Sequence, residues 1–181
     1  MRKLLSVIAV LAAMLSVKSA HALGVSAGLL VGNGFKDGYN IGVGVRAGVT
    51  LPVTPIYVGG TFIYHFGKTE TEPLTNQDFT TKTFYFGPEG GYDIGVGPLT
   101  VRPYLGLGYA SVSTTIPTIS VGGISIGGGS ASASKLAFWP GATALFSLGG
   151  AFVGADARYV IITDSGDFNA FSIFATGGLT F

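Results

Sequence analysis

Residues 40–51 read Asn-Ile-Gly-Val-Gly-Val-Arg-Ala-Gly-Val-Thr-Leu, with apolar side chains at every odd position and small or polar ones at every even position. Successive side chains on a β-strand point to opposite faces, so this alternation predicts a strand with one wholly apolar face. An amphipathic helix instead needs a repeat of about 3.6 residues, which this segment lacks. The segment therefore predicts a β-strand whose two faces meet different surroundings.

The same alternation recurs along the chain in segments that are separated by turn-forming residues. The predicted strands are residues 23–32, 40–51, 56–66, 83–94, 100–111, 135–148, 151–162 and 169–181. Every charged residue inside these strands falls on the small or polar face, namely Lys135 at the first position of its strand and six interior residues, Arg46, Glu89, Asp93, Arg102, Asp156 and Arg158. Proline cannot donate a ladder hydrogen bond, so we expect a bulge or a rim position at Pro88, Pro103 and Pro140.

Eight alternating strands fit two kinds of barrel. A soluble barrel would hold the apolar face inside, whereas a membrane barrel turns it towards lipid. Only 10% of the residues are charged, against about 25% in a typical soluble domain, and the six strand charges are too few to hydrate eight strands. Three basic and three acidic side chains can instead form ion pairs with one another inside a narrow lumen. The chain's 30 glycines would leave room there for large side chains. The predicted fold is therefore all-β, an eight-stranded antiparallel up-and-down transmembrane β-barrel.

The composition excludes several other classes of protein. A hydrophobic content of 48% and a net charge of +1 argue against intrinsic disorder. The chain has no cysteine, so a disulfide-stapled domain is excluded. The near-zero net charge gives no electrostatic reason to bind nucleic acid, and we expect no nucleic-acid partner.

Residues 1–22 predict a cleavable signal peptide, and residues 23–181 predict a single barrel domain. Met1-Arg2-Lys3 is basic, and residues 4–17 are almost wholly apolar. That run is shorter than the stretch of about 20 residues that a membrane-spanning helix needs. Ala20-His21-Ala22 then gives the small-x-small pattern of a cleavage site. Removal of this segment changes the net charge from +1 to −2, because Arg2, Lys3 and Lys18 are lost.

The predicted connections alternate in length. Longer loops are expected at residues 33–39, 67–82, 112–134 and 163–168, and tight turns near residues 52–55, 95–99 and 149–150. Outer-membrane barrels show this asymmetry, with short periplasmic turns and longer extracellular loops. Residues 67–82 are charged and predict a solvated loop. Residues 112–134 fit either a hairpin with an exposed edge for a surface ligand or a Ser/Gly-rich loop.

Three further features agree with this architecture. The signal peptide is followed at once by the first strand, and residues 101–109 and 154–159 read Val-Arg-Pro-Tyr-Leu-Gly-Leu-Gly-Tyr and Gly-Ala-Asp-Ala-Arg-Tyr. The last strand ends on Phe181, with Leu179, Ala175 and Ile173 on the same face, although Gly177 departs from that apolar pattern. On these grounds the chain resembles the OmpA/OmpX-type family of eight-stranded outer-membrane barrels.

The resemblance implies a monomer in the bacterial outer membrane, with both termini in the periplasm and with outer-membrane lipid and lipopolysaccharide around it. It also implies that Phe181 and Leu179 belong to a C-terminal signal that the barrel-insertion machinery reads. The expected function is a structural or surface-interaction role through the extracellular loops, with a lumen plugged by the six charged residues. The alternative is an OmpW-like narrow channel for small apolar molecules, which an open path past Trp139 and Arg102 would favour.

We expect no enzyme, no cofactor and no metal site. His65 is the single histidine of residues 23–181 and lies on the inward face of its strand. Small outer-membrane barrels that modify lipid are similar in size, but triad chemistry needs a base oriented by a third group, and no convincing set appears. A metal site needs three or four ligands, which a lone histidine does not provide. No catalytic, cofactor-binding or metal-binding residue is therefore predicted.

Overall fold

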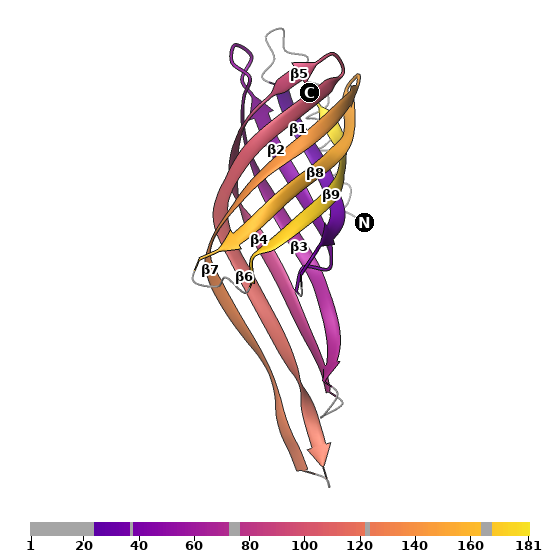
Figure 1. Cartoon of the computed structure of the whole chain (residues 1–181), viewed down its shortest axis with the longest axis vertical. Helices are drawn as coiled ribbons and strands as arrows, with labels where there is room; N and C mark the ends of the chain where they lie inside the picture. Colours follow the sequence, from indigo (N-terminus) through magenta and orange to yellow (C-terminus); the bar gives the residue numbers. More distant parts are fainter. Residues whose placement is uncertain (1–23, 37, 73–76, 122–123, 164–167) are drawn as a thin grey trace, which may run out of the picture.

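The computed structural model describes residues 24–36, 38–72, 77–121, 124–163 and 168–181, and almost all of them lie in β-strands (Figure 1). The strands are β1 (Gly24–Gly34), β2 (Ile41–Thr50), β3 (Ile56–Glu72), β4 (Gln77–Tyr92), β5 (Ile94–Val96), β6 (Leu99–Val121), β7 (Ile124–Leu148), β8 (Ala151–Ile162) and β9 (Ala170–Thr180). None of the described segments forms a helix long and apolar enough to cross a membrane. The predicted signal peptide, residues 1–22, lies outside the described residues.

The strands form one closed antiparallel sheet. Neighbours along the chain pair with one another, while β1 pairs with β9 and β4 pairs with β6. β4 and β5 are two parts of one barrel strand, interrupted at Asp93, since both pair with β6. The result is the predicted eight-stranded up-and-down barrel. The short connections 51–55, 97–98 and 149–150 lie at one end of it, where β1 begins and β9 ends.

The two faces of the barrel wall divide as the alternation predicts. The predicted outward-facing residues that the structure describes are all exposed or half-exposed, with Leu29 at 64% and Val45 at 51%. The opposite face points into the lumen, where Trp139 and Phe174 are completely buried. An outer wall of exposed Leu, Val, Ile and aromatic side chains is a poor surface for water and suits hydrocarbon.

Two hairpins extend beyond the predicted strand ends. β3 and β4 stay paired out to Glu72 and Gln77, so residues 67–72 and 77–82 form strands rather than the predicted loop. β6 and β7 likewise stay paired to their ends, so the described part of residues 112–134 forms a hairpin that projects beyond the barrel (Figure 1). The alternation of apolar side chains is needed only where the wall faces lipid, so it stops at the edge of the bilayer. Backbone pairing continues beyond that edge, where β-branched Thr residues favour the strand conformation.

Each of the three strand prolines lies where one ladder of the barrel is interrupted. The β4–β6 ladder is interrupted beside Pro88 and the β7–β8 ladder beside Pro140, in both cases without a shift in register. Pro103 faces the break between β4 and β5. Because proline has no N–H to donate, an interrupted ladder is where it disturbs pairing least. The prolines are accommodated by these interruptions rather than by the expected bulges.

Candidate functional site: charged clusters in the barrel lumen

Four charged side chains from β2, β4 and β8 form a closed ring of ion pairs inside the barrel, which we call the lumen ring. Arg46 Nε lies 2.8 Å from Glu89 Oε2, and Arg46 Nη2 lies 2.8 Å from Asp156 Oδ2. Arg158 Nε lies 2.7 Å from Asp156 Oδ1, and Arg158 Nη1 lies 3.4 Å from Glu89 Oε1. All four side chains are buried. The signs alternate around the ring, so its net charge is zero.

Neutral side chains add hydrogen bonds to the lumen ring. Tyr104 Oη lies within hydrogen-bond distance of both Asp156 oxygens, and Thr143 Oγ1 donates to Oδ2 at 2.6 Å. Trp139 Nε1 donates to Glu89 Oε1 at 2.8 Å. Buried charges are stable in a protein only when they are paired and hydrogen-bonded. These contacts explain how a narrow barrel interior holds two arginines and two acids.

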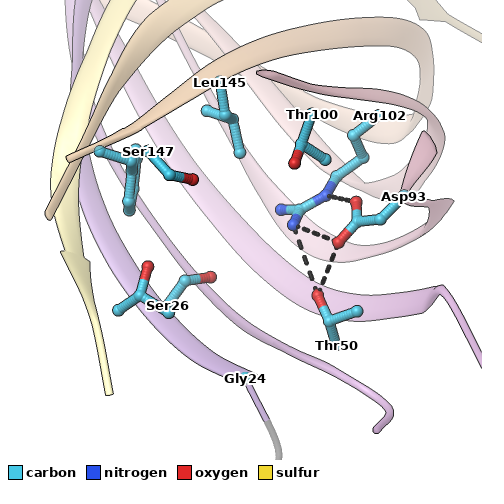
Figure 2. A pocket seen from close by; sticks show the side chains of 10 residues that line it. Gly24, Ser26, Thr50, Asp93, Thr100, Arg102, Leu145 and Ser147 are labelled. Carbon is cyan, nitrogen blue, oxygen red and sulfur yellow. Dashed lines mark hydrogen bonds and ion pairs between the residues drawn. The ribbon is translucent and has the colours of Figure 1, made fainter. Parts of the chain in front are cut away.

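The other two predicted lumen charges form a separate pair nearer the end that carries the short turns (Figure 2). Arg102 Nη2 donates to Asp93 Oδ2 at 2.8 Å, and Arg102 Nε donates to Asp93 Oδ1. Thr50 Oγ1 donates to Asp93 Oδ2 at 2.8 Å, and Arg102 Cζ lies 3.6 Å from the centre of the Tyr57 ring. The six predicted charges therefore all point inward, but they form two groups.

Sequence alternation identifies the inward residues but not their partners. It places Trp139, Tyr57 and Tyr104 on the inward face without linking them to a charge, and it gives Thr143 no role. Thr143 faces Asp156 directly across the β7–β8 ladder. That pairing depends on the register between strands, which the pattern within one strand does not contain.

Glycines beside the large lumen side chains make this packing possible. Gly106 faces Trp139 across the β6–β7 ladder, and a Cβ added to Gly106 would lie 1.9 Å from Trp139 Nε1. Gly42 stands in the same relation to His65, because an added Cβ would lie 2.6 Å from His65 Nδ1. At both positions glycine leaves the room that a large inward side chain needs.

Replacing Gly106 with alanine is expected to destabilise the barrel by about 1–3 kcal/mol, because the indole must leave the position in which it bonds Glu89. The control is Gly90→Ala on β4, where an added Cβ meets nothing within 4 Å. That control should change the stability by less than about 0.5 kcal/mol. Urea unfolding of both variants in lipid vesicles measures the difference, and equal stabilities would contradict the packing described.

An aromatic cluster fills the lumen around His65. The centre of the His65 ring lies 5.0 Å from the ring centre of Tyr39, 6.0 Å from that of Tyr85 and 5.8 Å from that of Phe174. His65 Nδ1 lies 2.9 Å from the carbonyl oxygen of Asn40. Burial raises the pKa of the Tyr39 phenol, so that side chain stays protonated. In the part of the chain that the structure describes, no acid bonds the imidazole, and His65 is a packed lumen residue.

The residues of the predicted insertion signal lie at the end of the last strand. Leu179 is exposed on the outward face of β9, and Phe181 follows the strand and is half-exposed. The Phe181 N–H donates to the carbonyl oxygen of Val25 at 2.9 Å, which ties this end to β1. Recognition of these residues by the insertion machinery stays a prediction.

Comparison with known proteins agrees with this architecture. The structure is similar to a major outer membrane protein from Thermus thermophilus, with a TM-score of 0.64 and 16% identity, over 89% of this chain and 100% of that one. It is also similar to Neisserial surface protein A (NspA), with a TM-score of 0.53, 15% identity, and coverage of 88% of this chain and 97% of that one. The N-terminal β-barrel domain of Pseudomonas aeruginosa OprF gives a TM-score of 0.50 at 13% identity, over 87% of this chain and 97% of that one.

These identities are low, so the solved structures show the fold alone. No curated protein matches the sequence at a significant level. The family model described as "Outer membrane protein beta-barrel domain" matches residues 4–176, which is nearly the whole sequence. The chain therefore belongs to the outer membrane protein β-barrel domain family and is a protein of the bacterial outer membrane.

Proposed function

We propose that this protein is a membrane anchor with a plugged lumen, and that it presents its β6–β7 hairpin at the cell surface for recognition. In outer-membrane barrels the short turns face the periplasm and the longer connections face outside. The β6–β7 hairpin leaves the barrel at the end opposite to the short turns (Figure 1). This projecting hairpin is the observation that carries the surface role, because it extends farther beyond the barrel than the β3–β4 hairpin at the same end (Figure 1).

The buried lumen charges support a plugged barrel. Trp139 is 0% exposed and Arg102 is 5% exposed, and both occupy positions that an open path would have to pass. A passing apolar molecule would also separate the charged and hydrogen-bonded side chains from their partners, which is costly. An OmpW-like channel for small apolar molecules is therefore the less well supported alternative.

The β6–β7 hairpin has a free backbone edge. β7 pairs with β8 only from Ala137 onward, so within the described chain residues 128–134 have β6 on one side and no strand on the other. These residues read Gly-Gly-Ser-Ala-Ser-Ala-Ser and are all exposed. They carry neither the charges nor the proline with which proteins block strand addition. An extended peptide can therefore add to this edge as a further strand.

Shortening the hairpin is expected to weaken the binding of extended peptides to the folded barrel, because it removes residues 128–130 of the free edge and leaves residues 131–134. The variant lacks residues 115–130. Thr115 and Ser130 face each other across the β6–β7 ladder, so the residues of β6 and β7 that remain are still paired with each other. The probe is an immobilised array of extended Thr- and Val-rich decapeptides, each with a proline-substituted counterpart. Binding of the barrel in lipid nanodiscs is measured, and we expect the wild type to retain the unsubstituted peptides only.

Two further variants separate the edge from the rest of the surface. The matched control shortens the β3–β4 hairpin by residues 70–79, whose ends are also paired with each other. The second variant, Ala131→Lys with Ala133→Lys, keeps the β6–β7 hairpin but places charges along its edge. The control should bind as the wild type does, and the lysine variant should not bind. Equal binding by all the proteins, or none by the wild type, would contradict the proposal.

A further inference from the structure

A cavity of about 210 Å³ lies inside the barrel at its periplasmic end (Figure 2). Its polar lining includes hydroxyl side chains and one ion pair, among them Ser26, Thr50, Thr100, Ser147, Asp93 and Arg102. The space is large enough for several water molecules or for one small ligand. The surface role proposed above does not use this cavity.

Arg102 is held in place with one nitrogen left unused. Its Nε and Nη2 bond the two oxygens of Asp93, and the Tyr57 ring covers the guanidinium. Nη1 forms no hydrogen bond with any described residue, although the Arg102 side chain is buried. In Figure 2 this nitrogen points into the cavity. Arg102 Nη1 is open to the cavity and can donate a hydrogen bond to water or to a ligand oxygen there.

The charges of the lining restrict the class of ligand. Asp93 already neutralises Arg102, so an anion at Nη1 would gain little and would approach a carboxylate. A cation would approach the guanidinium, and an apolar molecule would leave Nη1 and the hydroxyl groups without partners. A neutral molecule with several hydroxyl groups brings no like charge close to Arg102 or Asp93, and it can bond Nη1 and the hydroxyl groups of the wall. The buried Phe152 ring adds an apolar wall for its carbon skeleton.

We propose that this cavity binds a small neutral polyhydroxy compound, of the size of one sugar ring, from the periplasmic side. A hydroxyl group both donates and accepts, so one ligand oxygen accepts from Arg102 Nη1 and another ligand hydroxyl donates to Asp93. The Ser and Thr hydroxyl groups of the wall bond the remaining ligand oxygens. Asp93 and Tyr57 fix the guanidinium before the ligand arrives, which lowers the cost of ordering the site.

The test uses glucose, glycerol, acetate and phosphate as probes, each titrated into the folded protein in lipid nanodiscs. The backbone NMR signals of Thr50, Thr100 and Ser147 are followed, because these residues line the cavity. Glucose is expected to give saturable shifts, glycerol weaker ones, and the two anions none. Saturation by acetate or phosphate instead would overturn the proposal. So would the absence of saturable shifts with every probe, the result for a cavity that holds water only.

Three variants locate the binding site. Thr100→Val removes one hydroxyl group while keeping the side-chain shape, and should weaken glucose binding about two- to tenfold. Ser147→Leu fills the cavity and should abolish binding, whereas Ser132→Leu on the exposed hairpin should leave it unchanged. A heat-modifiable gel shift checks that each variant is folded. Wild-type affinity in both cavity variants, or an equal loss in Ser132→Leu, would place the binding elsewhere and overturn the proposal.

Discussion

Replacing Asp156 with alanine is expected to destabilise the folded barrel by about 3–5 kcal/mol. The Asp156 oxygens accept hydrogen bonds from both arginines of the lumen ring and from Tyr104 and Thr143. Without this carboxylate the two guanidinium groups share Glu89 alone, and the lumen ring keeps a net positive charge in a buried place. Removing one member of a buried ion pair is costly because the remaining charge stays desolvated.

The cost is measured by urea unfolding in lipid vesicles, with the fluorescence of Trp139, the single tryptophan of the chain, as the signal. Asp156→Asn keeps the shape and part of the hydrogen bonding, and should fall between the wild type and the alanine variant. Asp93→Ala should cost less, because the Asp93 side chain is 14% exposed and Arg102 can reach water. A cost below about 1 kcal/mol for Asp156→Ala would contradict the role assigned to the lumen ring.

Replacing Val45 with arginine is expected to cost about 2–4 kcal/mol. Val45 points outward on β2, and its cross-strand neighbours Leu29 and Phe62 are exposed on the same face. A guanidinium group there must lose its hydration or bend towards the membrane surface, and both are unfavourable. The same unfolding measurement gives the cost.

The matched control for this substitution is Ser132→Arg on the exposed β6–β7 hairpin. It adds the same charge outside the apolar band and should change the stability by less than about 0.5 kcal/mol. A small cost at both positions would mean that Val45 faces water, and the assignment of the outer wall to lipid would fail.

The barrel could be predicted from alternation within single strands because lipid and a narrow lumen make opposite demands on successive residues. Arg46 shows this clearly. It is the one charged residue in residues 40–51, and it lies on the face of the strand that carries the glycines. In the structure it points into the lumen beside two acidic side chains. The inward position of all six strand charges followed from the same reasoning.

The pairing inside the lumen could not be predicted in this way. Arg46 and Asp156 are 110 positions apart in the sequence, and their contact depends on barrel closure and on the register of every ladder between them. The paired end of the β3–β4 hairpin was missed for a different reason. Residues 67–82 lack the apolar alternation because no lipid covers them, yet their described backbone continues the β3–β4 ladder.

Electrical recording across a planar lipid bilayer tests the plugged lumen most directly. The lumen ring crosses the barrel interior with buried, hydrogen-bonded side chains, and the Arg102–Asp93 pair lies nearer the end that carries the short turns. With the wild-type barrel inserted, and its folded state verified by its heat-modifiable gel shift, we expect the current to stay at the level of a protein-free bilayer. Stable conductance steps from the wild-type protein would contradict the plugged lumen and would favour a channel function.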